Sequence, residues 1–124
     1  MIRYLSNYST ILLEKWQITK NAGQYTKQYV CQQLKTIGDL GIYYYTNDRS
    51  SCEVDFILDT GERIIPVEVK AEVNLKAKSL RTYCEKYHPE ISIRTSMADF
   101  KKEDWLINLP LYAVEEICNR EKWK

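Results

Sequence analysis

The sequence predicts an α/β domain in which a small mixed β-sheet is flanked by helices. Three features predict this fold class. The segment from Ala22 to Ile37 carries its apolar residues at the spacing of one helix face. Three segments rich in β-branched and aromatic residues follow, separated by polar turns, which is typical of an antiparallel meander. A second helix then leads to a fourth strand, and such a connection favours a parallel crossover.

The predicted core therefore has the order α-β-β-β-α-β. We expect Gly38 to stop the first helix, and we expect a helix, or a helix and a loop, from Ser9 to Lys20. The second helix is predicted to begin at Asn74, whose side chain can cap it, and to end at Tyr87. Strands are predicted at 42–46, 53–58, 64–71 and 91–95, with an edge strand at 109–113 and a helical turn at 114–118.

Composition limits the classes of function. The chain has 124 residues, 44% of them hydrophobic, and its formal net charge is +1. We expect one domain over residues 1–124. Because the net charge is close to zero, any contact with nucleic acid needs a local basic patch. The sequence has no apolar window of membrane-spanning length and no signal-peptide pattern, so we expect a cytoplasmic protein without membrane contact.

Missing motifs exclude several chemistries. The positions of the four glycines match neither the phosphate-binding loop of ATPases nor the dinucleotide-binding fingerprint, so we expect no nucleotide cofactor. The single histidine, His88, is expected to be a helix cap or surface residue, and no serine lies in a nucleophile motif. The cysteines are widely separated, which favours free thiols over a zinc site or a disulfide framework.

Acidic and basic residues meet in the predicted meander. Alternation puts Glu68 and Lys70 on one face of the third strand, opposite Val67 and Val69. The turn before this strand can bring Asp55 next to Glu68. Paired carboxylates with room for water suit Mg²⁺ or Mn²⁺, and a neighbouring lysine can act on the attacking water or on phosphate charge. The alternative is an ordinary ion pair on a solvent-facing sheet surface.

The order of these motifs resembles a known fold. An aspartate, then Glu-x-Lys, with a helix before the meander and a helix-strand crossover after it, resembles the PD-(D/E)XK fold of restriction endonucleases. More narrowly, the chain is similar to the DUF4143 domain found at the C-terminus of bacterial AAA-type ATPases. The similarity extends from Leu12 to Ala113 and is carried by motifs at 23–30, 44–45, 53–56, 65–71, 75–80, 83–87, 94–96 and 109–112.

The resemblance implies a nuclease-like fold and an ancestral metal-dependent phosphodiesterase. In an active version, Asp55, Glu68 and the backbone carbonyl of Val69 would hold Mg²⁺ or Mn²⁺, and Lys70 would serve the attacking water. The resemblance also implies an ATPase module as a partner. We therefore expect this chain to be either the C-terminal part of a longer protein or a freestanding descendant.

One position departs from the pattern of the family. The family's first helix carries a glutamate four residues after a glycine, whereas four residues after Gly23 this chain has Lys27. A lysine that points inward would weaken a metal site by like-charge repulsion, and one that points to solvent would do nothing.

A basic run adds a possible contact with nucleic acid. Lys76, Lys78 and Arg81 follow the predicted site, and they form either a phosphate-binding track or a solvated helix face. The sequence thus predicts a nuclease-like domain with a degenerate metal site. The alternative is a catalytically silent module that binds DNA or a protein partner for an ATPase.

Overall fold

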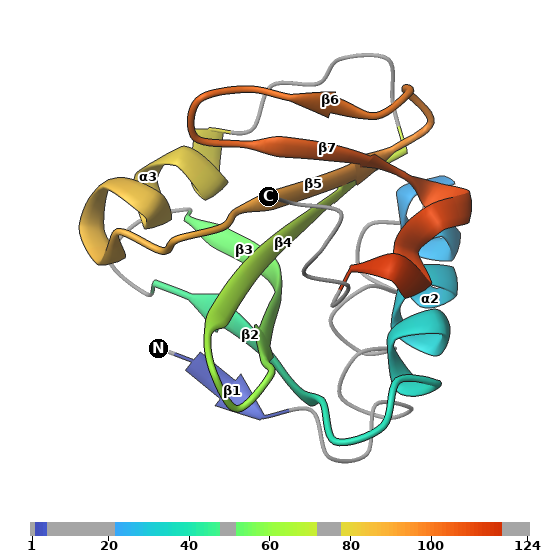
Figure 1. The fold of residues 1–124 in the computed structure, drawn as a ribbon, viewed down its shortest axis with the longest axis horizontal. Helices are drawn as coiled ribbons and strands as arrows, with labels where there is room; N and C mark the ends of the chain where they lie inside the picture. Colours follow the sequence, from blue (N-terminus) through green and yellow to red (C-terminus); the bar gives the residue numbers. More distant parts are fainter. Residues whose placement is uncertain (1, 5–21, 48–51, 72–77, 118–124) are drawn as a thin grey trace.

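The computed structural model describes residues 2–4, 22–47, 52–71 and 78–117. The strands form a seven-stranded sheet in the order β1-β2-β3-β4-β5-β7-β6. Helix α2 and the 3₁₀ helix η1 cover one face of this sheet, and α3 covers the other (Figure 1). The elements are β1 Ile2–Tyr4, α2 Ala22–Lys35, β2 Gly41–Thr46, β3 Glu53–Asp59, β4 Ile64–Lys70, α3 Lys78–Tyr87, β5 Ile93–Ser96, β6 Lys101–Lys102, β7 Ile107–Pro110 and η1 Leu111–Glu116.

The predicted α/β class and the order of the core elements are confirmed. Strands β2, β3 and β4 form the antiparallel meander, because each pairs antiparallel with the next. Helix α3 then connects β4 to β5, and these two strands pair in parallel, as a crossover requires. The parallel strands β4, β5 and β7 therefore have their carboxyl ends at the same edge of the sheet.

Strand β7 differs from the prediction. An edge strand was expected at 109–113, but β7 covers Ile107–Pro110 and lies inside the sheet, parallel to β5 on one side and antiparallel to the short β6 on the other. Leu111–Glu116 forms the helix η1, where strand and then a helical turn were predicted. Strand β1 was not predicted, and it forms the outer edge beside β2.

The end of α2 also differs. The helix stops at Lys35, and its last turn tightens because the N–H groups of Thr36 and Ile37 donate to carbonyls three residues earlier. The left-handed residue after it is Asp39, with φ of 58°, and not the expected Gly38. A short polar side chain tolerates this conformation, so a glycine is not required there. The helix predicted at 9–20 lies outside the described residues.

Helix α3 follows the prediction where it is described. It begins at Lys78, while Asn74, the predicted cap, lies outside the described residues. Leu80 and Tyr83 are buried against the sheet. His88 ends the helix as expected: it has φ of 51°, and its N–H donates to the carbonyl of Cys84 at 2.9 Å. Of the four cysteines, those at 31, 52 and 84 are free thiols, and Cys118 lies outside the described residues.

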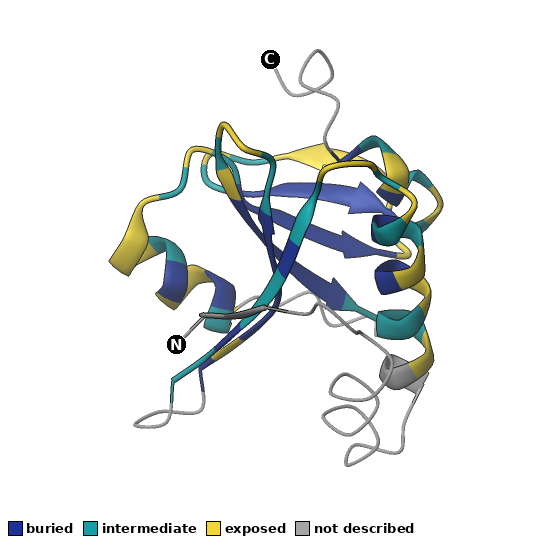
Figure 2. Cartoon of the chain, turned by 90° about the horizontal axis from the view of Figure 1, so that it is seen from below, coloured by how far each residue is buried: buried dark blue, intermediate teal, exposed yellow. Residues whose placement is uncertain are grey.

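Two apolar clusters form the core, one on each face of the sheet. Figure 2 shows the buried strands between the two helical layers. Alternation along β4 is regular: Ile65, Val67 and Val69 belong to the cluster beneath α2. Alternation along β3 is irregular, since Val54 belongs to the α3 cluster whereas Phe56, two residues later, belongs to the α2 cluster. The register between β2 and β3 shifts at this point, so a β-bulge breaks the strict alternation that was expected around Asp55.

Candidate functional site

The hairpin between β3 and β4 brings the two predicted acids together. Asp59 Oδ1 accepts a hydrogen bond from the Gly61 N–H at 2.8 Å, and Gly61 has φ of 87°, which suits a residue without a side chain. This turn sets a register in which Phe56 pairs with Val67. The next residues outward are Asp55 and Glu68, so both carboxylates lie at the same level of the sheet.

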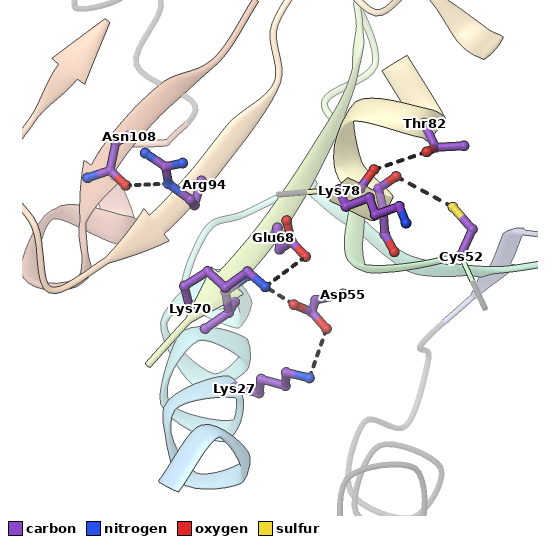
Figure 3. Close-up of polar contacts among 11 residues, drawn as sticks. Lys27, Cys52, Asp55, Glu68, Lys70, Lys78, Thr82, Arg94 and Asn108 are labelled. Carbon is purple, nitrogen blue, oxygen red and sulfur yellow. Dashed lines mark hydrogen bonds and ion pairs between the residues drawn. The ribbon is translucent and has the colours of Figure 1, made fainter. Parts of the chain in front are cut away.

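Asp55 is held from two neighbouring elements. Its Oδ2 atom accepts a hydrogen bond from the backbone N–H of Val69 at 2.9 Å, and its Oδ1 atom lies 3.1 Å from the Nζ atom of Lys27. Figure 3 shows the Lys27 side chain extending from α2 toward this carboxylate. The inward orientation is therefore the one that Lys27 adopts. Both oxygens of Asp55 already have a donor.

Glu68 is as buried as Asp55 and lies beside Lys70. Its Oε1 atom is 3.6 Å from Lys70 Nζ, and its buried Oε2 atom has no hydrogen-bond partner among the described residues. Burial is the main reason that the pKa of Glu68 is raised to about 7: the Lys70 charge opposes the increase, the Asp55 charge adds to it, and Lys27 opposes it more weakly. Near neutral pH, Glu68 is therefore partly protonated.

The charges of this cluster do not fit a divalent cation. Even when both carboxyl groups are ionised, the two ammonium groups balance them, so no excess negative charge attracts Mg²⁺ or Mn²⁺. Lys27 also lies against the Asp55 oxygen that a metal would need. Over the part of the chain that the structure describes, no three His, Cys, Asp or Glu side chains gather into a metal-binding group. The Val69 carbonyl as a ligand remains a prediction.

Comparison with protein families identifies the chain. A family model, the domain of unknown function DUF4143, matches residues 22–113. The chain belongs to the DUF4143 family. The match includes α2, the meander, α3 and β7, and therefore every described residue of the predicted site. A search of curated proteins found none that matches this chain.

The predicted basic run of this DUF4143 domain is only partly described. Lys78 and Arg81 lie exposed on α3, and Lys76 falls outside the described residues. Arg81 forms an ion pair with Glu85 at 3.5 Å and lies over the ring of Trp105. Helix α3 covers the sheet face to which Glu68 and Lys70 belong, so these basic residues lie on the same side of the domain as Lys70. No helix in the described ranges is long and apolar enough to cross a membrane.

A polar cluster that was not predicted from the sequence lies next to this site. Arg94, in β5, pairs in register with Glu68 on one side and with Asn108 on the other. The Oδ1 atom of buried Asn108 accepts hydrogen bonds from Arg94 Nε at 2.9 Å and from Ser96 Oγ at 2.8 Å (Figure 3 shows the first). Its Nδ2 atom donates to the carbonyls of Ala98 and Asp99. The sequence did contain a signal for this cluster: alternation along β5 puts Arg94 and Ser96 on the same face of the sheet as Glu68 and Lys70.

Proposed function

We propose that this domain is a catalytically silent, nuclease-like module that binds nucleic acid through its backbone phosphates. The observation that carries the proposal is the contact of 3.1 Å between Lys27 and Asp55. This contact puts an ammonium group against one of the carboxylates that would bind a metal ion in an active version of the site. The same lysine therefore weakens cation binding and makes the site more favourable to an anion.

Charge on the surrounding surface supports phosphate binding. Lys27 and Lys70 have 25% and 30% of their side chains exposed, so both can be reached from solvent. Helix α3, on the side of Lys70, carries three basic residues and one acidic residue. Phosphate contacts of this kind give affinity without sequence preference. Association with an ATPase module, which the resemblance implies, would place this binding under the control of a second domain.

Binding is tested by fluorescence anisotropy with labelled DNA, with the whole chain and with Lys70→Gln. Removing one phosphate contact should weaken binding by about fivefold and reduce the salt dependence by about one counterion. Lys102→Gln is the matched control, because Lys102 is an exposed lysine on the edge strand β6, at the far end of the sheet from β3. Failure of the wild-type chain to bind DNA, or equal weakening by both variants, would refute the proposal.

A metal-dependent phosphodiesterase is the second candidate function. It is favoured by the convergence of Asp55, Glu68 and Lys70, and by the buried Glu68 oxygen that lacks a partner among the described residues. Nicking of supercoiled DNA in the presence of Mn²⁺ distinguishes the two candidates. We expect no nicking by the wild-type chain. Nicking that is absent from Asp55→Ala would instead establish the enzyme.

A further inference from the structure

A groove of about 540 Å³ lies between α2 and η1, beside the end of β5. Its walls are three tyrosines, Tyr25, Tyr29 and Tyr112, together with Met97 and Leu111. Exposed fractions of 73% for Tyr25 and 76% for Tyr112 are large for aromatic residues, which are usually at least half buried. No charged side chain among the described residues lines the groove. It therefore offers flat, neutral, aromatic surfaces.

The groove borders the two lysines of the candidate site. Thr26, which lines the groove, directly precedes Lys27 in α2. Ser96, which also lines it, pairs in register with Lys70 of β4. The two lysines and the aromatic groove therefore meet at the carboxyl ends of the parallel strands, where ligands of open α/β sheets generally bind.

We propose that this groove stacks unpaired nucleobases, so that the module prefers single-stranded over double-stranded nucleic acid. The inference rests on the proposed function, because the lysines would hold the phosphates of the same strand. Charge complementarity supports this occupant: a nucleic-acid strand with anionic phosphates and neutral base faces matches two solvent-accessible lysines that lie next to a neutral aromatic groove. A duplex hides its base faces in the stack, so it can reach the lysines but cannot fill the groove.

The experiment compares labelled oligothymidylate with a duplex of equal length, by fluorescence anisotropy with the whole chain. Each of Tyr25→Leu and Tyr112→Leu should weaken single-strand binding about tenfold, because a stacked base contributes about 1–3 kcal/mol, and leave duplex binding unchanged. Tyr112→Phe keeps the ring and should retain wild-type affinity. Phe100→Leu is the control, since Phe100 is also an exposed aromatic residue but does not line the groove.

The outcomes separate this inference from the proposed function. Loss of single-strand binding in the leucine variants alone supports base stacking. Equal affinity of the wild-type chain for both nucleic acids, or wild-type affinity in the leucine variants, overturns base stacking while phosphate binding stands. An apolar protein segment would then be the occupant to test. Absence of binding to either nucleic acid overturns both proposals.

Discussion

Lys27 and Asp55 form an ion pair of 3.1 Å that links the helix α2 to the bulged part of β3. The second oxygen of Asp55 accepts the N–H of Val69, so the same carboxylate also joins β3 to β4. One side chain thus connects three elements at the centre of the candidate site. We therefore expect the identity of residue 27 to affect both the stability of the domain and the ions that the site can bind.

Lys27→Glu should convert the site into one that binds a divalent cation. The change replaces the cation at Asp55 with a third carboxylate, which adds both a ligand and excess negative charge. Isothermal titration with Mn²⁺ should detect saturable binding by this variant and none by the wild-type chain. Adding Asp55→Ala to the Lys27→Glu variant should abolish Mn²⁺ binding. Lys27→Gln adds no carboxylate, so it should bind Mn²⁺ at least tenfold more weakly than Lys27→Glu does. Equally tight binding by the wild-type chain would contradict our account of the site.

Lys27→Met should destabilise the domain. The change leaves Asp55, a largely buried carboxylate, without its counterion, and we expect a loss of about 1–2 kcal/mol in the free energy of unfolding. Urea unfolding measures this loss. Lys101→Met is the matched control, because the pair of Lys101 with Glu103 is more exposed and should contribute less than about 0.5 kcal/mol. In a double-mutant cycle, Asp55→Asn should recover part of the loss. Equal effects of the two lysine changes would indicate that the Lys27 pair is an ordinary surface pair.

Glu68 should make the stability of the domain fall as the pH rises. Its pKa is raised from 4.5 to about 7, so the folded state binds the proton more tightly than the unfolded state does. Below about pH 4.5 Glu68 is protonated in both states and does not lower the free energy of unfolding. As the pH rises, the free energy of unfolding falls, and above about pH 7 the full loss of up to about 3 kcal/mol is reached. Glu68→Gln should therefore stabilise the domain at about pH 8 but not at about pH 4. Urea unfolding at several pH values measures the free energy of unfolding of the wild-type chain and of Glu68→Gln. If the two pH profiles run parallel, Glu68 does not cause the loss of stability.

Asn108 should be important for stability because its amide is fully hydrogen-bonded in a buried position. Asn108→Leu has a similar volume but leaves the Arg94 guanidinium and the Ser96 hydroxyl without this acceptor, and we expect a loss of at least about 3 kcal/mol. Asn108→Asp keeps the acceptor and should lose less. Urea unfolding of both variants provides the comparison. A leucine variant as stable as the wild-type chain would show that these hydrogen bonds contribute no net stability.

Local patterns in the sequence determined much of this fold. Apolar spacing along α2, alternation along β4 and the Asp59–Gly61 turn each depend on interactions between residues a few positions apart, so they were predicted nearly correctly. The parallel pairing of β4 with β5 also followed, because a helix between two strands favours that connection. The same alternation put Glu68 and Lys70 on one face of the sheet, apart from Val67 and Val69.

Long-range contacts decided the rest. The β-bulge at Asp55, the interior place of β7 and the edge strand β1 depend on pairing between distant segments, which no local pattern specifies. The direction of Lys27 was open in the sequence, because a helix residue next to a buried face can point inward or outward. Packing of α2 against the sheet resolved it, by bringing the ammonium to a buried carboxylate whose charge would otherwise be costly. The sequence by itself therefore determined which charged residues the site contains, and only the tertiary structure decided that Lys27 points inward and pairs with Asp55.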